Sequence, residues 1–205
     1  MRNEPQPARG LLVAFFALWV VLAIAPKYRA DWAVENVLVA AFFVCLWLAR
    51  RRVTLSQGAW VLLIAFLSLH EVGAHYTYSE VPYDAWFHAL TGKSLNALLG
   101  FERNHYDRLV HFSAGLLLLR PMREALCTQF NLTVFTSCLL CVNIVMSGSM
   151  LYELIEWGAA NVFGAGLGAA YLGSQGDPWD AQKDMALATL GALVAWLGTA
   201  FRSRA

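Results

Sequence analysis

The sequence has few charged residues. Asp, Glu, Lys and Arg make up 14% of its 205 residues, while 59% are hydrophobic and the mean hydropathy is +0.51. Charged residues are about a quarter of a typical soluble domain. The shortage therefore argues against an ordinary soluble protein and predicts a membrane protein that resides in a lipid bilayer.

Excess charge of one sign and linker segments are also missing. The formal net charge is +1, and Lys and Arg occur in small groups at the ends of apolar segments. This pattern argues against a nucleic-acid partner. No Pro-, Ser- or Gly-rich linker, charge block or internal repeat divides the chain, so we expect one transmembrane domain over residues 1–205.

Several catalytic motifs are absent as well. Cys138 and Cys141 form a C-x-x-C inside an apolar run without a companion pair, which predicts packing and no disulfide. His70 and His75 are five residues apart, whereas a zincin helix needs two His four apart. No serine lies in a recognisable nucleophile elbow. These patterns give no support to a zincin or a serine hydrolase.

The chain does contain apolar runs long enough to cross a bilayer. A helix needs roughly 20 apolar residues to span the hydrocarbon, and fewer where neighbours shield its ends. We expect an all-α, polytopic membrane protein with a bundle of about six transmembrane helices. Ala25 leads straight into Pro26, so the first span should remain uncleaved. The expected spans are residues 9–25, 33–49, 55–76, 106–119 (ending at Arg120 and Pro121), 132–157 and 178–201.

The basic residues between these spans predict the orientation. With the N-terminus in the cytoplasm, nine Lys and Arg lie inside against six outside, which favours cytoplasmic placement of both termini. All polar runs of interest then meet at the outer face. They are HEVGAHYTY (70–78), NHYDRLVHF (104–112), YELIEW (152–157) and GDPWDAQKDM (176–185).

Acids and histidines in these runs recur three or four residues apart, so the members of each pair share a helix face. An inner layer, nearer the membrane centre, is expected from Glu71, His111, Glu153 and Asp184. An outer layer is expected from His75, Asp107, Glu156 and Asp180. Each layer combines carboxylates with one imidazole.

The inner layer predicts a cation site. Three acids and a His cannot all remain charged in a poorly solvated bundle unless a positive group joins them, since unpaired buried charge costs several kcal/mol. Oxygen and imidazole ligands suit Mn²⁺, Fe²⁺ or Zn²⁺, and an all-oxygen subset would suit Mg²⁺ or Ca²⁺. Protonation of one or two acids would serve instead and would give a proton-handling site.

Structural interpretations exist for some of these residues. Asp177 before a proline has the pattern of an N-cap, and Asp180 would complement the helix dipole. Glu156 would mark where its helix leaves the membrane. Arg108 and Lys183 could pair with the acids in a network without metal. The other histidines are expected to be interfacial polar residues: His70, His88 and His105.

Two connections carry their own signals. Residues 77–104 form a long outer segment whose Trp and Leu residues predict a short interfacial helix or a lid. Residues 158–176 are rich in Gly and Ala and predict a close-packed outer hairpin.

The motifs HYTYSEVP (75–82), RNHYDRLVHF (103–112), YELIEWGAA (152–160) and LGSQGDPWDAQKDM (172–185) carry a family resemblance. From about Leu55 to its C-terminus the chain resembles the YjdF-like family, defined by a domain of unknown function. The resemblance implies a multi-pass protein of the bacterial inner membrane and no particular activity. The order Asp107…His111-Phe112, then Glu153, then Asp180…Asp184 is also similar, more distantly, to the pattern of VanZ-like membrane proteins, which implies a link to the cell envelope.

These observations predict a metal-dependent enzyme or binding protein for an amphipathic, envelope-facing substrate. The inner layer would hold the ion, and His75 or Asp107 would act as acid or base. The alternatives are a cation or proton transporter, and a structural membrane protein whose acids and bases pair with one another. The patterns indicate no oligomeric state.

Overall fold

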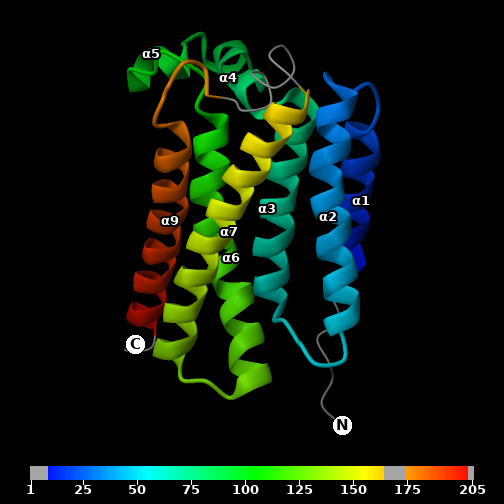
Figure 1. The fold of residues 1–205 in the computed structure, drawn as a ribbon, viewed down its shortest axis with the longest axis vertical. Coiled ribbons are helices and arrows are strands. Elements are labelled where there is room, and N and C mark those ends of the chain that lie inside the picture. The colour runs from blue at the N-terminus through cyan, green and yellow to red at the C-terminus, as the bar shows by residue number, and fades with distance from the viewer. Residues whose placement is uncertain (1–8, 164–173, 203–205) are drawn as a thin grey trace.

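The structure is a computed structural model that describes residues 9–163 and 174–202, and every regular element in these ranges is a helix. The long helices run alternately up and down through the bundle in Figure 1. They are α1 (Arg9–Leu22), α2 (Arg29–Ala49), α3 (Gln57–Tyr76), α6 (Tyr106–Phe130), α7 (Val134–Phe163) and α9 (Asp180–Arg202). The short elements are η1 (Tyr78–Glu80), α4 (Tyr83–Thr91) and α5 (Leu95–Leu99). The all-α prediction is confirmed.

Three helices are long and apolar enough to cross a membrane, namely α2, α3 and residues Val134–Val162 of α7. Helix α1 is apolar but has only 14 residues. Length and composition therefore give three candidate spans within the described residues, together with several further helices.

Helix α6 does not end at Arg120 and Pro121 as expected but continues to Phe130. A proline inside a helix removes one backbone hydrogen bond and disfavours the preceding turn. Tertiary contacts hold this turn in place. Glu124 accepts hydrogen bonds from Arg120 Nε (2.9 Å) and from the backbone N–H of Ser56 (2.8 Å), the N-cap residue of α3. Packing between α3 and α6 thus overrides the local proline signal.

Helices α6 and α9 form the most extensive helix contact in the described part of the chain. A Cβ atom added to Gly115 would lie 1.9 Å from the carbonyl oxygen of Ala188, and one added to Gly191 would lie 2.1 Å from that of Phe112. Only glycine permits this approach of two backbones. The contact brings the first two turns of α6 and α9 together, and these turns carry Asp107, Asp180 and Asp184.

The ends of α3 and α7 and the starts of α6 and α9 lie at one end of the bundle, beneath α4 and α5 (Figure 1). Residues 77–104 form the short 3-10 helix η1 and two short α-helices here in place of one helix, and Trp86, Leu90, Leu98 and Leu99 are exposed on α4 and α5. At the other connection α7 remains helical to Phe163, and the rest of the expected hairpin, residues 164–173, lies outside the described residues.

The apolar core lies between the long helices. Cys138 and Cys141 are free thiols, fully buried against Leu119, Ala188 and Ala192. The expectation that this pair packs in the apolar core is confirmed.

Candidate functional site

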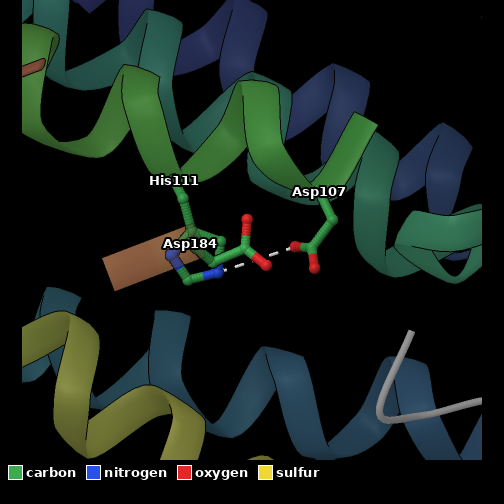
Figure 2. Close-up of side chains that lie close together, drawn as sticks. All are labelled: Asp107, His111 and Asp184. Atoms are coloured by element: carbon green, nitrogen blue, oxygen red, sulfur yellow. Dashed lines mark ion pairs between the residues drawn. The ribbon is translucent and has the colours of Figure 1, made fainter. Parts of the chain in front are cut away.

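His111 lies at the centre of a buried polar group formed by three helices. One ligand atom from each of Asp107, His111 and Asp184 lies within 4.8 Å of the other two, and Figure 2 shows these side chains pointing toward one another. The imidazole Nε2 is 3.7 Å from Asp107 Oδ1 and 3.4 Å from Glu153 Oε1. We call Asp107, His111, Glu153 and Asp184 the cation group.

The acids of the cation group have buried oxygens without hydrogen-bond partners in the described structure: Asp107 Oδ1, Glu153 Oε1 and Asp184 Oδ1. Asp184 is 1% exposed. Uncompensated buried carboxylates are costly, so this arrangement requires protons or a cation among the oxygens.

The imidazole is oriented by a second contact. His111 Nδ1 lies 3.3 Å from Ser149 Oγ on α7, so Nε2 faces the acids. The ring also meets Tyr152 edge to face at 5.6 Å. Histidines at protein metal sites are usually held in this way, with one ring nitrogen hydrogen-bonded and the other facing the ion.

Two acids assigned to the outer layer lie in different settings. Glu156 is buried, 4% exposed, and its charge interacts most strongly with those of Asp107 and Glu153, so it borders the cation group. Asp180 is also buried, 7% exposed, but it pairs with the largely buried guanidinium groups of Arg103 and Arg108. The two expected layers are therefore not kept, because Asp107 of the outer layer joins His111 and Asp184 of the inner one.

The surface above the cation group carries an ion-pair network that we call the rim: Arg103, Arg108, Asp177, Asp180 and Lys183. Arg108 contacts Asp177 Oδ2 at 2.6 Å and Asp180 Oδ1 at 3.2 Å, and Arg103 pairs with Asp180. Lys183 Nζ lies 2.6 Å from Asp177 Oδ2. Hydrogen bonds from Lys183 and from the backbone N–H of Trp179 lower the pKa of Asp177 well below its usual range. The network expected from Arg108 and Lys183 thus forms, and it engages the outer acids.

Glu71 and His75 do not join the cation group. Glu71 is fully buried beside Asn36 of α2, and neither of its oxygens has a well-formed hydrogen bond in the described structure. His75 Nδ1 lies 2.7 Å from the carbonyl oxygen of Leu22 at the end of α1. This face of α3 is directed at α1 and α2, so the placement of Glu71 in the inner layer is corrected.

His70, the residue before Glu71, faces α6 and α7 in place of Glu71. His70, expected to be interfacial, is buried and its Nδ1 lies 2.6 Å from the hydroxyl of Tyr78. Its Nε2 lies 3.8 Å from Glu35 Oε2 on α2. Tyr152 donates to the Glu35 carboxylate at 3.0 Å.

Sequence reasoning missed Glu35 altogether. A signal was present, since Asp31 and Glu35 are four residues apart at the start of an apolar helix and both are buried.

A cavity of about 270 Å³ borders both polar groups, and we call it the main cavity for that reason. A larger cavity, of about 450 Å³ and lined by residues such as Asn143 and Thr189, borders neither group. The main cavity lies between α3, α6 and α7. Its polar lining gathers at the outer end and consists of His70, Tyr78, Asp107, His111, Ser149 and Tyr152. The rest of the lining is apolar and includes Leu118, Met122 and Val145. A cation held by three or four protein ligands could keep an open position toward this space.

The comparisons with known proteins agree with this architecture. The family described as "Predicted membrane protein (DUF2238)" matches residues 7–204. The chain is 34% identical over 179 residues to the "Inner membrane protein YjdF" of Escherichia coli (strain K12), covering 85% of this chain and 79% of that protein. No solved structure matches the chain. The resemblance seen in the motifs is confirmed and extends into the N-terminal helices. The chain belongs to the DUF2238 family of predicted membrane proteins.

Proposed function

We propose that this protein is a multi-pass inner-membrane protein that binds a divalent cation at Asp107, His111, Glu153 and Asp184. The cation would serve a metal-dependent enzyme or binding protein for an amphipathic substrate at the outer face. The single observation that carries the proposal is the set of buried, unpartnered carboxylate oxygens around the Nε2 atom of His111.

The donor set indicates which ions would fit. Carboxylate oxygens with one imidazole suit Mn²⁺, Fe²⁺ or Zn²⁺, and the carboxylates alone would suit Mg²⁺. Such an ion polarises a bound oxygen or lowers the pKa of bound water. Because Asp107 belongs to the ligand set and His75 is directed at α1, neither is retained here as the acid or base.

The orientation also belongs to the proposal. Six crossings are supported by the six long helices in alternating directions. Exposed Trp157 and Trp179 at the end that carries the cation group fit a membrane-interface belt. Helix α2 ends at the opposite end of the bundle (Figure 1), and the exposed residues Arg50, Arg51 and Arg52 follow it directly, as expected for the cytoplasmic side.

Transport is the weaker alternative. A cation or proton path would need polar groups from the cation group toward the cytoplasmic end. Below His111 and Ser149 the main cavity is lined by apolar residues such as Leu118, Met122 and Val145. This apolar lining fits a site that binds one amphipathic molecule better than it fits a continuous path for ions.

Metal analysis of the purified full chain tests the proposal. We expect about one equivalent of a transition metal, or stabilisation by added Mn²⁺, Zn²⁺ or Mg²⁺. Saturation at 100 times Kd adds about 2.7 kcal/mol, which corresponds to a rise in Tm of roughly 5–10 °C. Asp184→Asn and His111→Gln should abolish both signals.

Asp31→Asn is the matched control. Asp31 is a buried acid, 4% exposed, that lies on α2 and pairs with Thr77, so its loss should leave metal binding intact. Absence of metal and of metal-induced stabilisation in the wild type would refute the proposal. Equal metal binding by wild type and Asp184→Asn would refute the ligand assignment.

A further inference from the structure

We propose that the main cavity holds one acyl chain of a membrane lipid, which enters sideways from the outer leaflet between α3 and α7. This inference names a lipid as the substrate class of the cation group. The placement of the lipid headgroup at the cation group rests on the proposed function. The placement of the acyl chain rests on the cavity alone, so acyl-chain binding and cation binding can be tested separately.

The cavity has the dimensions and polarity gradient of an amphiphile. On α6 its lining runs from Asp107 to Met122, a length of about 22 Å along the helix axis. Polar atoms are confined to the outer end beside His111, and the lining from Ala114 to Met122 on α6 is apolar. Water is poorly held in an apolar space, whereas hydrocarbon fills it favourably.

The cavity is open toward the bilayer. Ile144 and Gly148 on α7 line it, yet both are exposed at the surface, Ile144 by 46%. Among the described residues α7 packs closely against α6 and α9, and α3 against α1, α2 and α6. Both α3 and α7 are candidate membrane spans, so the opening between them lies at the depth of lipid tails. A lipid chain is the molecule that meets such an opening.

A smaller cavity of about 190 Å³ adjoins the main cavity on the α2 side. The two share Phe66, His70, Leu118 and Tyr152 in their linings. Its remaining lining is apolar, from α2 and α3. The hydrocarbon space therefore continues past Phe66, while the polar residues stay at the outer end where a lipid headgroup would lie.

Gly148 allows the cavity to be filled without disturbing the fold. A Cβ atom added there meets nothing within 4 Å, and its backbone is helical. Gly148→Phe should place its ring in the opening. Ala114→Leu narrows the same space from α6 and serves as a second variant. Gly198→Phe is the matched control, because Gly198 has equal free space on α9 and lines none of the cavities described here.

The experiment uses the full chain in phospholipid vesicles that contain a phospholipid with a photoactivatable diazirine on its acyl chain. After irradiation, labelled peptides are identified by mass spectrometry, and metal content is measured in the same preparations. We expect labelling at Leu118 and Met122 in the wild type and in Gly198→Phe. In Gly148→Phe and Ala114→Leu this labelling should fall about tenfold.

The outcomes separate the two proposals. Unchanged labelling at Met122 in both cavity variants, or none in the wild type, would overturn the acyl-chain inference even if metal binds. Labelling that follows the expected pattern in a protein that neither contains a divalent cation nor is stabilised by one would support the acyl chain and refute the cation proposal.

Discussion

The contact between α6 and α9 gives a prediction that needs no ligand. A Cβ atom on Gly191 would lie 2.1 Å from the carbonyl oxygen of Phe112 and 2.9 Å from the backbone nitrogen of Leu116. Both are backbone atoms, so no side chain can rotate away. Gly191→Ala must therefore separate the two helices locally by about 1 Å.

Overpacking of this kind costs about 1–3 kcal/mol, offset by up to about 1 kcal/mol from the better helix propensity of alanine. For a chain of this size each kcal/mol lowers Tm by roughly 2–4 °C, so we expect a fall of several degrees. Asp184 lies two turns away on the same face of α9, about 10 Å along the axis. Because metal ligands tolerate shifts of only about 0.2 Å, metal affinity should fall as well.

Gly198→Ala is the control for this prediction. It lies on the same helix, and a Cβ atom there meets nothing within 4 Å, so it should leave Tm unchanged or raise it slightly. Tm is measured in one detergent by the exposure of buried thiols, since Cys138 and Cys141 lie in the adjoining core. If Gly191→Ala were as stable as Gly198→Ala, the close approach of the two helices would be wrong.

Two further predictions concern the ends of α3 and α6. Glu124→Ala removes the acceptor for the N–H and hydroxyl groups of Ser56 and for the guanidinium of Arg120. The free energy of unfolding should therefore fall by about 1–2 kcal/mol, measured by thermal unfolding. An unchanged Tm would contradict this cap network. His105, outside the spans, has its pKa lowered from 6.5 by burial and then by repulsion from Arg108 and Arg103. The unfolded chain binds that proton more readily, so stability is full above about pH 6.5 and decreases as pH falls below it. His105→Gln should flatten the slope of Tm against pH between about 5 and 7, and an identical slope would refute the assignment.

The sequence predicted at which end of the bundle the polar residues gather, because apolar length and chain direction determine position along a helix axis. It did not predict which way each helix is rotated. Glu71 and His70 are neighbours on α3, about 100° apart around its axis. A polar residue on either face fits the same apolar pattern, so only packing determines that His70 faces the cavity and Glu71 faces Asn36.

The prediction of where α6 ends was wrong for a different reason. Arg120 and Pro121 are a strong local signal for a helix end, and the contact that overrides it comes from Ser56, 68 residues before Glu124. Glu35 was missed because it lies near the start of an otherwise apolar span. Its partners, His70 and Tyr152, come from helices far along the chain.

The largely buried carboxylates differ in whether their oxygens have hydrogen-bond partners, and this difference bears on the cation group. Glu124 accepts hydrogen bonds from a backbone N–H, a hydroxyl and a guanidinium, so each of its oxygens has a partner. The acids around His111 leave an oxygen each without one, although Arg108 lies close enough to pair with Asp180. A purely structural network would be expected to direct that arginine inward, since breaking a buried pair costs about 3–5 kcal/mol. The basic side chains instead pair with the rim acids, and the oxygens of Asp107 and Glu153 face the His111 imidazole without a hydrogen bond, which leaves them available to the cation that we propose.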